Sequence, residues 1–219
     1  MESDWIFQEV GSAIKDLVER FFSEPFFFYT EQDMHAYLYH ELITGRLGTE
    51  RAVTSLGDMT VLVHREYPTL NKYPSESGKA TRGHFDLAVI DPAEASKSHW
   101  RRQQALYATH KPKVAVEIGL NEIGTTKFNL AHYNKDFTRL TDPENSVERG
   151  YLLFFVRRED FLNNSGMHPV INEIPSILSQ MCEQEQDRTG NLVVVYAECK
   201  KPGTKLLRVI PESRAPWVG

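Results

Sequence analysis

RGHFDLAVI at residues 82–90 and KVAVEIG at residues 113–119 decide the fold of this chain. Both runs are short and rich in β-branched residues, which predicts two strands. Each run contains one carboxylate, Asp86 in the first and Glu117 in the second. An ionised acid inside a sheet carries a large desolvation cost unless it has a partner. We therefore expect both acids to face a cleft or to share a cation.

The spacing of the two acids predicts that they face each other. If the strands pair antiparallel, with residues 91–112 as their connection, the register that pairs Ile90 with Lys113 also pairs Asp86 with Glu117. Directly opposed side chains on one face of a sheet lie roughly 5 Å apart. Two carboxylates at that distance repel each other unless a proton or a divalent metal joins them. Their oxygen atoms suit Mg²⁺ or Mn²⁺, so the pair predicts a metal site.

This pair of acidic strands resembles the PD-(D/E)XK nuclease superfamily, which has the restriction-endonuclease-like fold. The resemblance covers residues 29–157 and includes an acidic first helix at 29–39, a first strand at 63–68, a helix at 134–140 and a further strand at 150–156. It implies an α/β fold with a mixed central sheet flanked by helices. It also implies a metal-dependent nuclease that hydrolyses phosphodiester bonds in DNA or RNA.

The resemblance implies roles for particular residues. Asp86 and Glu117 would hold one or two Mg²⁺ (or Mn²⁺) ions, and the backbone carbonyl of Ile118 would complete the metal shell. Glu31 or Glu66 would orient a water molecule or a second ion. Glu31 is equally well explained as a first-turn acid that favours the helix dipole, and Glu66 as a solvated residue near a strand end.

Gly119 departs from the family pattern. The family has a lysine two residues after the acid, near the attacking water, and this chain has glycine there. Either a cation from elsewhere takes its place or the chemistry has been lost. Lys127, at the start of the helix expected after the second strand, is our candidate for the replacement. Loss of one such electrostatic contact can cost roughly 10²–10³ in rate.

Residues 97–113 form the most basic part of the chain. The window contains five cationic side chains and no acid, interleaved with Trp100 and Tyr107. The five are Lys97, Arg101, Arg102, Lys111 and Lys113. Cations for phosphates, together with aromatic rings that stack on bases, suit nucleic acid. The alternative is an exposed helix with an ordinary charged face.

Other segments predict further elements. Apolar residues at three- and four-residue steps predict a helix over residues 4–22. Alternation predicts a strand over residues 59–67, and the prolines, glycine and small polar residues of 68–81 predict a loop. Residues 192–197 predict a strand, with 205–210 pairing beside it.

At 219 residues the chain fits one domain. We divide it into an N-terminal helical extension (1–28), a nuclease-like core (29–157) and a C-terminal helix and strands (158–219). Two cysteines are too few for a disulfide framework, which indicates a reducing compartment. The N-terminus has no basic-then-apolar leader, and no run is long enough to cross a bilayer. We therefore expect a cytoplasmic protein without membrane association.

Two alternatives to a nuclease stay open. In the first, the chain keeps the fold, has lost catalysis and binds nucleic acid or a partner protein. Gly119 favours this, and so does the net charge of −5, since tight non-specific binding depends on neutralising phosphates. In the second, the chain is structural, and Asp86 and Glu117 are bridged to Arg82 or Lys113. The sequence does not separate DNA from RNA, and the fold is compatible with a homodimer without demonstrating one.

Overall fold

The structure is a computed structural model of the chain. It describes residues 4–54, 57–74, 78–96, 110–123, 130–158, 176, 178–180, 182–183, 191–201 and 204–211.

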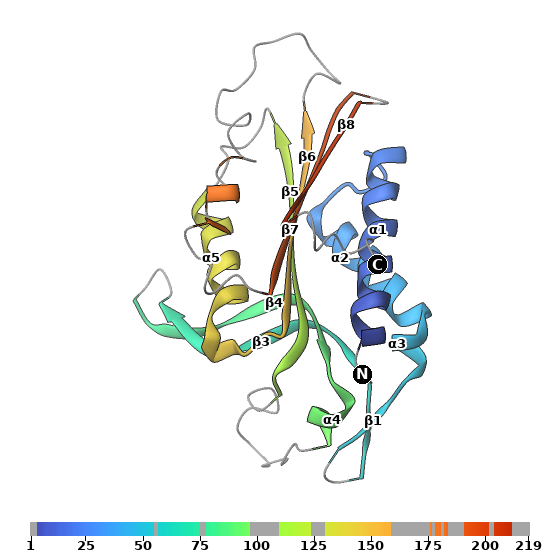
Figure 1. Cartoon of the computed structure of the whole chain (residues 1–219), viewed down its shortest axis with the longest axis vertical. Coiled ribbons are helices and arrows are strands. Elements are labelled where there is room, and N and C mark those ends of the chain that lie inside the picture. The colour runs from blue at the N-terminus through green and yellow to red at the C-terminus, as the bar shows by residue number, and fades with distance from the viewer. Residues whose placement is uncertain are drawn as a thin grey trace.

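A six-stranded mixed sheet forms the centre of the molecule (Figure 1), and its strands follow one another in chain order. They are β3 (Val63–Pro74), β4 (Ala80–Ile90), β5 (Pro112–Ile123), β6 (Arg149–Arg158), β7 (Leu192–Lys201) and β8 (Thr204–Ile210). The first three strands pair antiparallel, β5, β6 and β7 pair parallel, and β8 returns antiparallel to β7. The sheet is therefore antiparallel at both ends and parallel in the middle.

Helices cover both faces of this sheet (Figure 1). On one side lie α1 (Asp4–Ser23), α2 (Glu31–Thr44) and the short α3 (Arg46–Thr49), and on the other side lies α5 (Leu130–Thr141). The minor elements are α4 (Pro92–Ala95), the 3₁₀ turn η1 (Pro143–Asn145), and the two-stranded pair β1 (Ala52–Val53) and β2 (Met59–Thr60).

The apolar run of β6 explains why both faces need cover. All side chains from Tyr151 to Val156 are buried, as expected of a parallel strand that is covered on both sides. Successive side chains point to opposite faces, so Phe155 meets Phe21 of α1 at 5.0 Å between ring centroids, and Phe154 meets Tyr133 of α5 at 4.1 Å. The two helical layers are thus fixed to the sheet through adjacent residues of one strand.

The start of α2 is fixed by the predicted capping box. The Thr30 hydroxyl accepts the backbone N–H of Asp33, and the Asp33 carboxylate accepts the backbone N–H of Thr30. These bonds satisfy donors that the first helical turn leaves open. They fix Glu31 and His35 at the end of α2 that lies near β4 and β5.

Most elements predicted from the sequence are confirmed. The helix at 4–22 corresponds to α1, the two acidic strands to β4 and β5, and the strands at 192–197 and 205–210 to β7 and β8 in antiparallel pairing. The predicted register of β4 with β5 is confirmed at Leu87–Val116. It is wrong at Ile90, which pairs with Pro112 across a bulge.

The loop predicted at residues 68–81 is wrong. β3 continues to Pro74 and β4 begins at Ala80, with Lys72 opposite Arg82. The strand expected over 59–67 is correspondingly divided between β2 and β3. The extension is held by distant partners, because the Asn71 amide and the Tyr73 hydroxyl both donate to Asp142 beside η1. Contacts about 70 residues away along the chain override the local composition.

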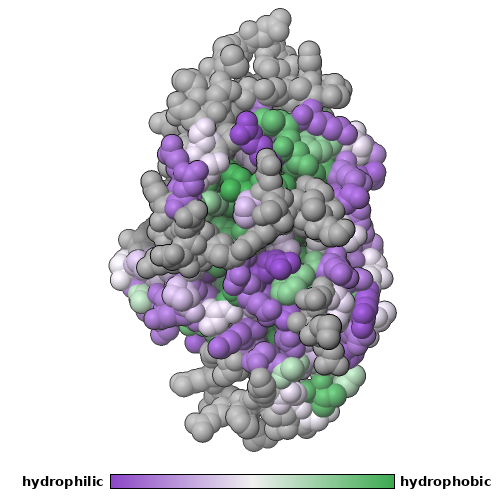
Figure 2. Space-filling model, in the orientation of Figure 1, coloured by the Kyte–Doolittle hydropathy of each residue, from purple (hydrophilic) through white to green (hydrophobic). Residues whose placement is uncertain are grey.

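A small group of exposed apolar side chains lies near the lower end of the molecule. On the face in Figure 2, hydrophilic residues predominate across the middle, and a small hydrophobic area lies where Figure 1 places β1. Val53 of β1 is 51% exposed and Met59 of β2 is 64% exposed. Within the described residues, no helix combines the length and the apolar character needed to span a bilayer.

Candidate functional site

The site lies where β4 and β5 separate. The backbone pairing of these strands extends to Leu87 and Val116, so Asp86 and Glu117 are the next residues along the same register. There the Asp86 carboxylate, not a backbone carbonyl, accepts the Ile118 N–H at 2.7 Å. The strands therefore part at the acids, and Asp86 satisfies the backbone donor that the parting leaves open.

Glu117 is the more deeply buried of the two acids, with 1% of its surface exposed. Burial raises its pKa well above the ordinary glutamate value, the neighbouring Asp86 and Asp136 raise it further, and Arg139 opposes them. Burial also raises the pKa of Asp86, against an opposing effect of His35. Asp86 therefore makes Glu117 harder to ionise, while the hydrogen bond with Glu117 lowers the pKa of Asp86, as expected of two carboxyl groups that share one proton.

The cation nearest to Glu117 comes from α5. Arg139 Nε lies 3.0 Å from Glu117 Oε1, and the same guanidinium pairs with Asp136 one turn earlier in the helix. Burial lowers the pKa of Arg139, but the three acids around it raise it by more. Gly83 makes room for this side chain, since a Cβ there would lie 2.7 Å from Arg139 Cδ.

Gly119 lies under an aromatic ring. A Cβ on Gly119 would lie 2.7 Å from both the Oη and a ring carbon of Tyr133, closer than real contacts allow. Tyr133 is 4% exposed and packs on Phe154, so its ring has little freedom to move aside. The position at which the nuclease resemblance expects a lysine is therefore closed to any side chain while Tyr133 stays in place.

The other side of the site comes from α2 and β3. His35 Nε2 lies 3.4 Å from Asp86 Oδ2 and 3.9 Å from Glu31 Oε1. Glu31 Oε2 accepts the Leu120 N–H at 3.3 Å, which ties the first turn of α2 to β5. One ligand atom each of His35, Glu66 and Asp86 lie within 4.8 Å of one another. Helices from both layers thus meet the acid pair at the end of the β4–β5 pairing.

Four predicted residues are therefore brought together: Glu31, Glu66, Asp86 and Glu117. The Ile118 contact that the structure gives is through its N–H rather than its carbonyl. Lys127 lies outside the described residues and stays a prediction.

The predicted basic window is largely outside the described part of the chain, which leaves out Lys97, Arg101 and Arg102. Lys111 is exposed. Lys113 is 5% exposed, and its Nζ lies 2.8 Å from Glu148 and 3.3 Å from Asp91. Its ammonium group is therefore engaged within the protein and not offered to a phosphate. The alternative in which Lys113 or Arg82 bridges the acid pair is also not what is found, since Arg139 holds Glu117.

Three site residues were not selected from the sequence: His35, Asp136 and Arg139. A signal existed for each. His35 follows Glu31 by four residues and so shares its helix face, while Asp136 and Arg139 are three residues apart on α5. These spacings recur on any charged helix, and nothing in the sequence says which helix face turns toward the acids.

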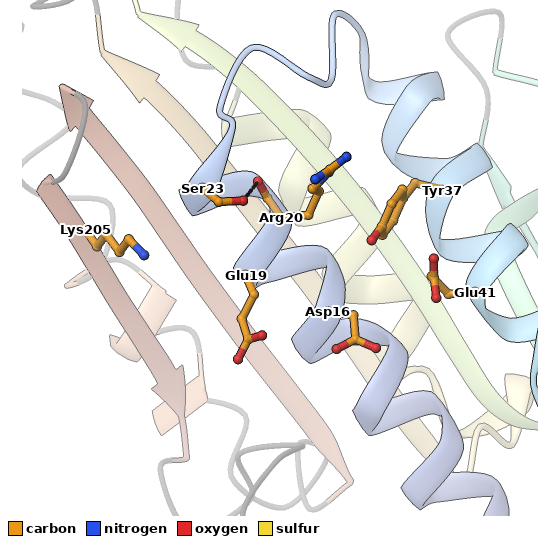
Figure 3. Close-up of a pocket in the computed structure, with 7 residues that line it drawn as sticks. All are labelled: Asp16, Glu19, Arg20, Ser23, Tyr37, Glu41 and Lys205. Carbon is orange, nitrogen blue, oxygen red and sulfur yellow. Dashed lines mark hydrogen bonds between the residues drawn. The ribbon is translucent and has the colours of Figure 1, made fainter.

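A second feature, an open hollow, lies away from these residues between α1, α2 and β8 (Figure 3). It is lined by Asp16, Glu19, Arg20, Ser23, Tyr37, Glu41 and Lys205. Three carboxylates share it with two cations, and Arg20 already pairs with Glu24 at 2.9 Å. Mixed charges of this kind are expected of a solvated surface, so the acid pair is the stronger candidate.

Comparison of the chain with protein-family models, with curated proteins and with solved structures found no match in any of the three.

Proposed function

We propose that the chain is a divalent-metal-dependent nuclease of the PD-(D/E)XK type, acting on phosphodiester bonds in DNA or RNA. The observation that carries the proposal is the acid pair at the point where β4 and β5 part. Burial raises the pKa of both carboxyl groups, and Asp86 raises the pKa of Glu117 further. Two acids held this close, at the end of a strand pairing, suit a hard cation.

The order of elements supports the same proposal. The resemblance to the restriction-endonuclease-like fold expects an acidic helix, a strand, two acidic strands, a helix and a further strand. The chain has α2, β3, β4, β5, α5 and β6 in that order, within a mixed sheet flanked by helices. Fold alone does not give function, so the proposal rests on the two acids.

The residues present fit a divalent ion. Glu117 Oε1 is buried and, within the described residues, has no hydrogen-bond partner, although Arg139 lies at ion-pair distance. Asp86 and Glu117 would hold the ion, with the Ile118 carbonyl as a further oxygen donor. When bound, the ion would neutralise charge on the phosphodiester and lower the pKa of a nearby water molecule.

We assign the role of the missing motif lysine to Arg139. Its guanidinium already contacts Glu117, and its side chain is 20% exposed, so it can face a phosphate at the mouth of the site. An arginine stays protonated at any ordinary pH, so it would stabilise developing negative charge and would not act as a base. Lys127 remains the other candidate for this charge.

A catalytically degenerate nuclease fold that binds nucleic acid or a partner protein is the alternative. Two observations favour it: Tyr133 closes the Gly119 position, and Arg139 is already paired with Asp136 and Glu117. A guanidinium shared between two acids has less charge left to offer to a phosphate.

A cleavage assay on single- and double-stranded DNA and RNA, with Mg²⁺ or Mn²⁺, tests the proposal. The wild type is compared with Asp86→Asn, Glu117→Gln and Arg139→Ala, and with Asp58→Asn as a matched change of an exposed acid. We expect the first two variants to lose cleavage and Arg139→Ala to lose roughly 10²–10³ in rate, while Asp58→Asn keeps it. Folded wild-type protein that binds nucleic acid without cutting it would support the degenerate alternative.

A further inference from the structure

We propose that His35, Glu66 and Asp86 form a metal centre that binds divalent transition-metal ions in preference to Mg²⁺. The inference shares Asp86 with the proposed function and rests on it only for what the ion would be used for. The donor atoms alone decide which ion the centre prefers.

The three donors come from three different elements, α2, β3 and β4. One ligand atom of each lies within 4.8 Å of the other two, a spacing that one ion can bridge. The site reaches solvent on one side, because Glu66 is exposed and the Asp86 side chain is 19% exposed. An ion can therefore enter, and it can keep water in its remaining positions.

The buried nitrogen of His35 is the strongest sign of a ligand. His35 is 4% exposed, and its Nε2 has no hydrogen-bond partner within the described residues. The atom is nevertheless aimed at carboxylates, 3.4 Å from Asp86 Oδ2 and 3.9 Å from Glu31 Oε1. Buried polar atoms without a partner are rare in folded proteins and call for an explanation. A cation between the imidazole and the carboxylates of Asp86 and Glu66 would supply the missing partner.

Glu66 reaches this group at a conformational cost. Its φ of 47° is in the left-handed region, between regular pairs of β3 with β4 at Arg65–Leu87 and Tyr67–Phe85. A residue with a side chain pays roughly 1–2 kcal/mol for that conformation. Such outliers persist where the surrounding structure imposes them, and they cluster at functional sites. The distortion falls at the one position of β3 whose carboxylate joins the group.

The imidazole decides which ions fit. Mg²⁺ is bound in proteins by carboxylates and water and has little affinity for nitrogen donors. Mn²⁺, Co²⁺ and Zn²⁺ all accept an imidazole together with carboxylates, in the order of increasing affinity known for such sites. With His35 in the donor set, transition-metal ions gain a ligand that Mg²⁺ cannot use well. His35 is thus the residue that sets the preference.

Metal binding can be measured on the metal-free full-length protein without nucleic acid. Free Mn²⁺ is counted by its electron paramagnetic resonance signal during titration, and Mg²⁺ is then added as a competitor. The variants are His35→Gln and Glu66→Gln. The matched control is His40→Gln, which changes an exposed histidine of the same helix. Glu66 is exposed, so its variant tests the site even if His35→Gln fails to fold.

We expect the wild type and His40→Gln to bind Mn²⁺ at least about tenfold more tightly than Mg²⁺. Loss of residues that merely support metal ligands typically costs about 10–100-fold in affinity, so Glu66→Gln should lose at least about tenfold in Mn²⁺ affinity. His35→Gln should lose the preference for Mn²⁺ while its Mg²⁺ affinity changes little. Equal affinity for the two ions in the wild type, or unchanged Mn²⁺ affinity in both variants, would overturn the inference.

The two proposals fail in different ways. Mn²⁺ binding that depends on His35 and Glu66, in a protein that cuts no nucleic acid, would retain this metal centre and remove the nuclease. Cleavage that depends on Asp86 and Glu117, with no selectivity between Mn²⁺ and Mg²⁺, would retain the nuclease and remove this inference.

Discussion

Glu117 shows how one residue links the acid pair to stability. Its carboxyl group is almost fully buried, and its folded-state pKa is raised by burial and by two neighbouring acids. The native state therefore holds a proton that the unfolded chain releases at lower pH. Ionising Glu117 in the folded protein requires Arg139 to compensate for burial, and one shared guanidinium does so only in part.

We expect the melting temperature of the metal-free protein to fall as the pH rises above about 4.5, the ordinary value for a glutamate. Because the folded-state pKa is raised, this contribution is fully present below the unfolded-state pKa and is lost as the pH rises through the folded-state pKa. Asp86 acts in the same direction. Thermal melts across this range should show a shallower decline in Glu117→Gln. An identical decline in the variant would contradict the assignment.

Glu66 gives a second prediction at the scale of one residue. In Glu66→Gly the left-handed conformation no longer costs free energy, which stabilises the folded state. The glycine also raises the entropy of the unfolded chain, which offsets part of this gain. The net effect on the free energy of unfolding is expected to lie between zero and an increase of about 1 kcal/mol. We expect the variant to be as stable as the wild type or slightly more stable in chemical denaturation without metal. Its stabilisation by added Mn²⁺ should be much reduced, because a ligand that binds only the native state raises stability. A strongly destabilised variant would mean that Glu66 has a structural role instead.

At the scale of elements, the contact of β5 with α5 fixes the shape of the site. The ring of Tyr133 lies over Gly119, and the side chain of Arg139 passes over Gly83. Two glycines on neighbouring strands therefore admit two large side chains from one helix. This is how α5 brings a guanidinium to the buried end of the acid pair.

We expect Gly119→Ala to destabilise the protein by about 1–3 kcal/mol, the usual cost of forcing an extra carbon into a packed interior. In a Tyr133→Ala background the same change should cost clearly less, because the atoms that it meets are gone. Denaturant unfolding of the two single variants and the double variant gives the coupling, which we expect to be on the order of 1 kcal/mol. Additive effects would mean that the ring does not restrict position 119.

Local pattern and long-range packing differ in how far the sequence predicts them. The register that leads to Asp86 and Glu117 was predictable over residues 87–89, which pair with 114–116, although the pair from which the count starts, Ile90 with Lys113, is displaced by a bulge. The extension of β3 to Pro74 was not, because it depends on Asp142, far along the chain. Residues 68–81 have the composition of a loop, and only the folded chain supplies the partners that make them strands.

The residues of the site also differ in how well the sequence predicts them. The acids stand out in the sequence because a charge in an apolar run needs a reason. Arg139 and His35 do not stand out, because charged and polar residues on an amphipathic helix are ordinary. Which of them faces the acids depends on the rotation of α5 and α2 against the sheet, and that is set by contacts such as Tyr133 on Phe154.

At the scale of the whole molecule, α1 is part of the central packing and not an appendage. Phe21 is fully buried and meets Phe155 of the central strand β6, and Ile14 and Leu17 of the same helix are also buried. Apolar residues of α1 and of the sheet therefore belong to one hydrophobic core. The helix covers the face of the sheet opposite α5 (Figure 1).

We expect Phe21→Ala to destabilise the protein by about 3–5 kcal/mol, as is typical for removal of a buried aromatic ring. Tyr29→Ala, a matched truncation of an 83% exposed ring, should change stability by no more than about 0.5 kcal/mol. Denaturant unfolding followed by circular dichroism measures both. A single transition is expected in each, and a separate early transition in Phe21→Ala would show that α1 unfolds independently.

The packing of Tyr133 over Gly119 also constrains how this chain can change over generations. A lysine at position 119 would clash with the ring, and loss of the ring first would leave a cavity against Phe154. Each of the two first steps lowers stability, whichever is taken. Any path of single substitutions from this arrangement to the glutamate–x–lysine pattern therefore passes through a less stable protein. A lineage that carries both residues is expected to improve its site through α5 rather than through β5.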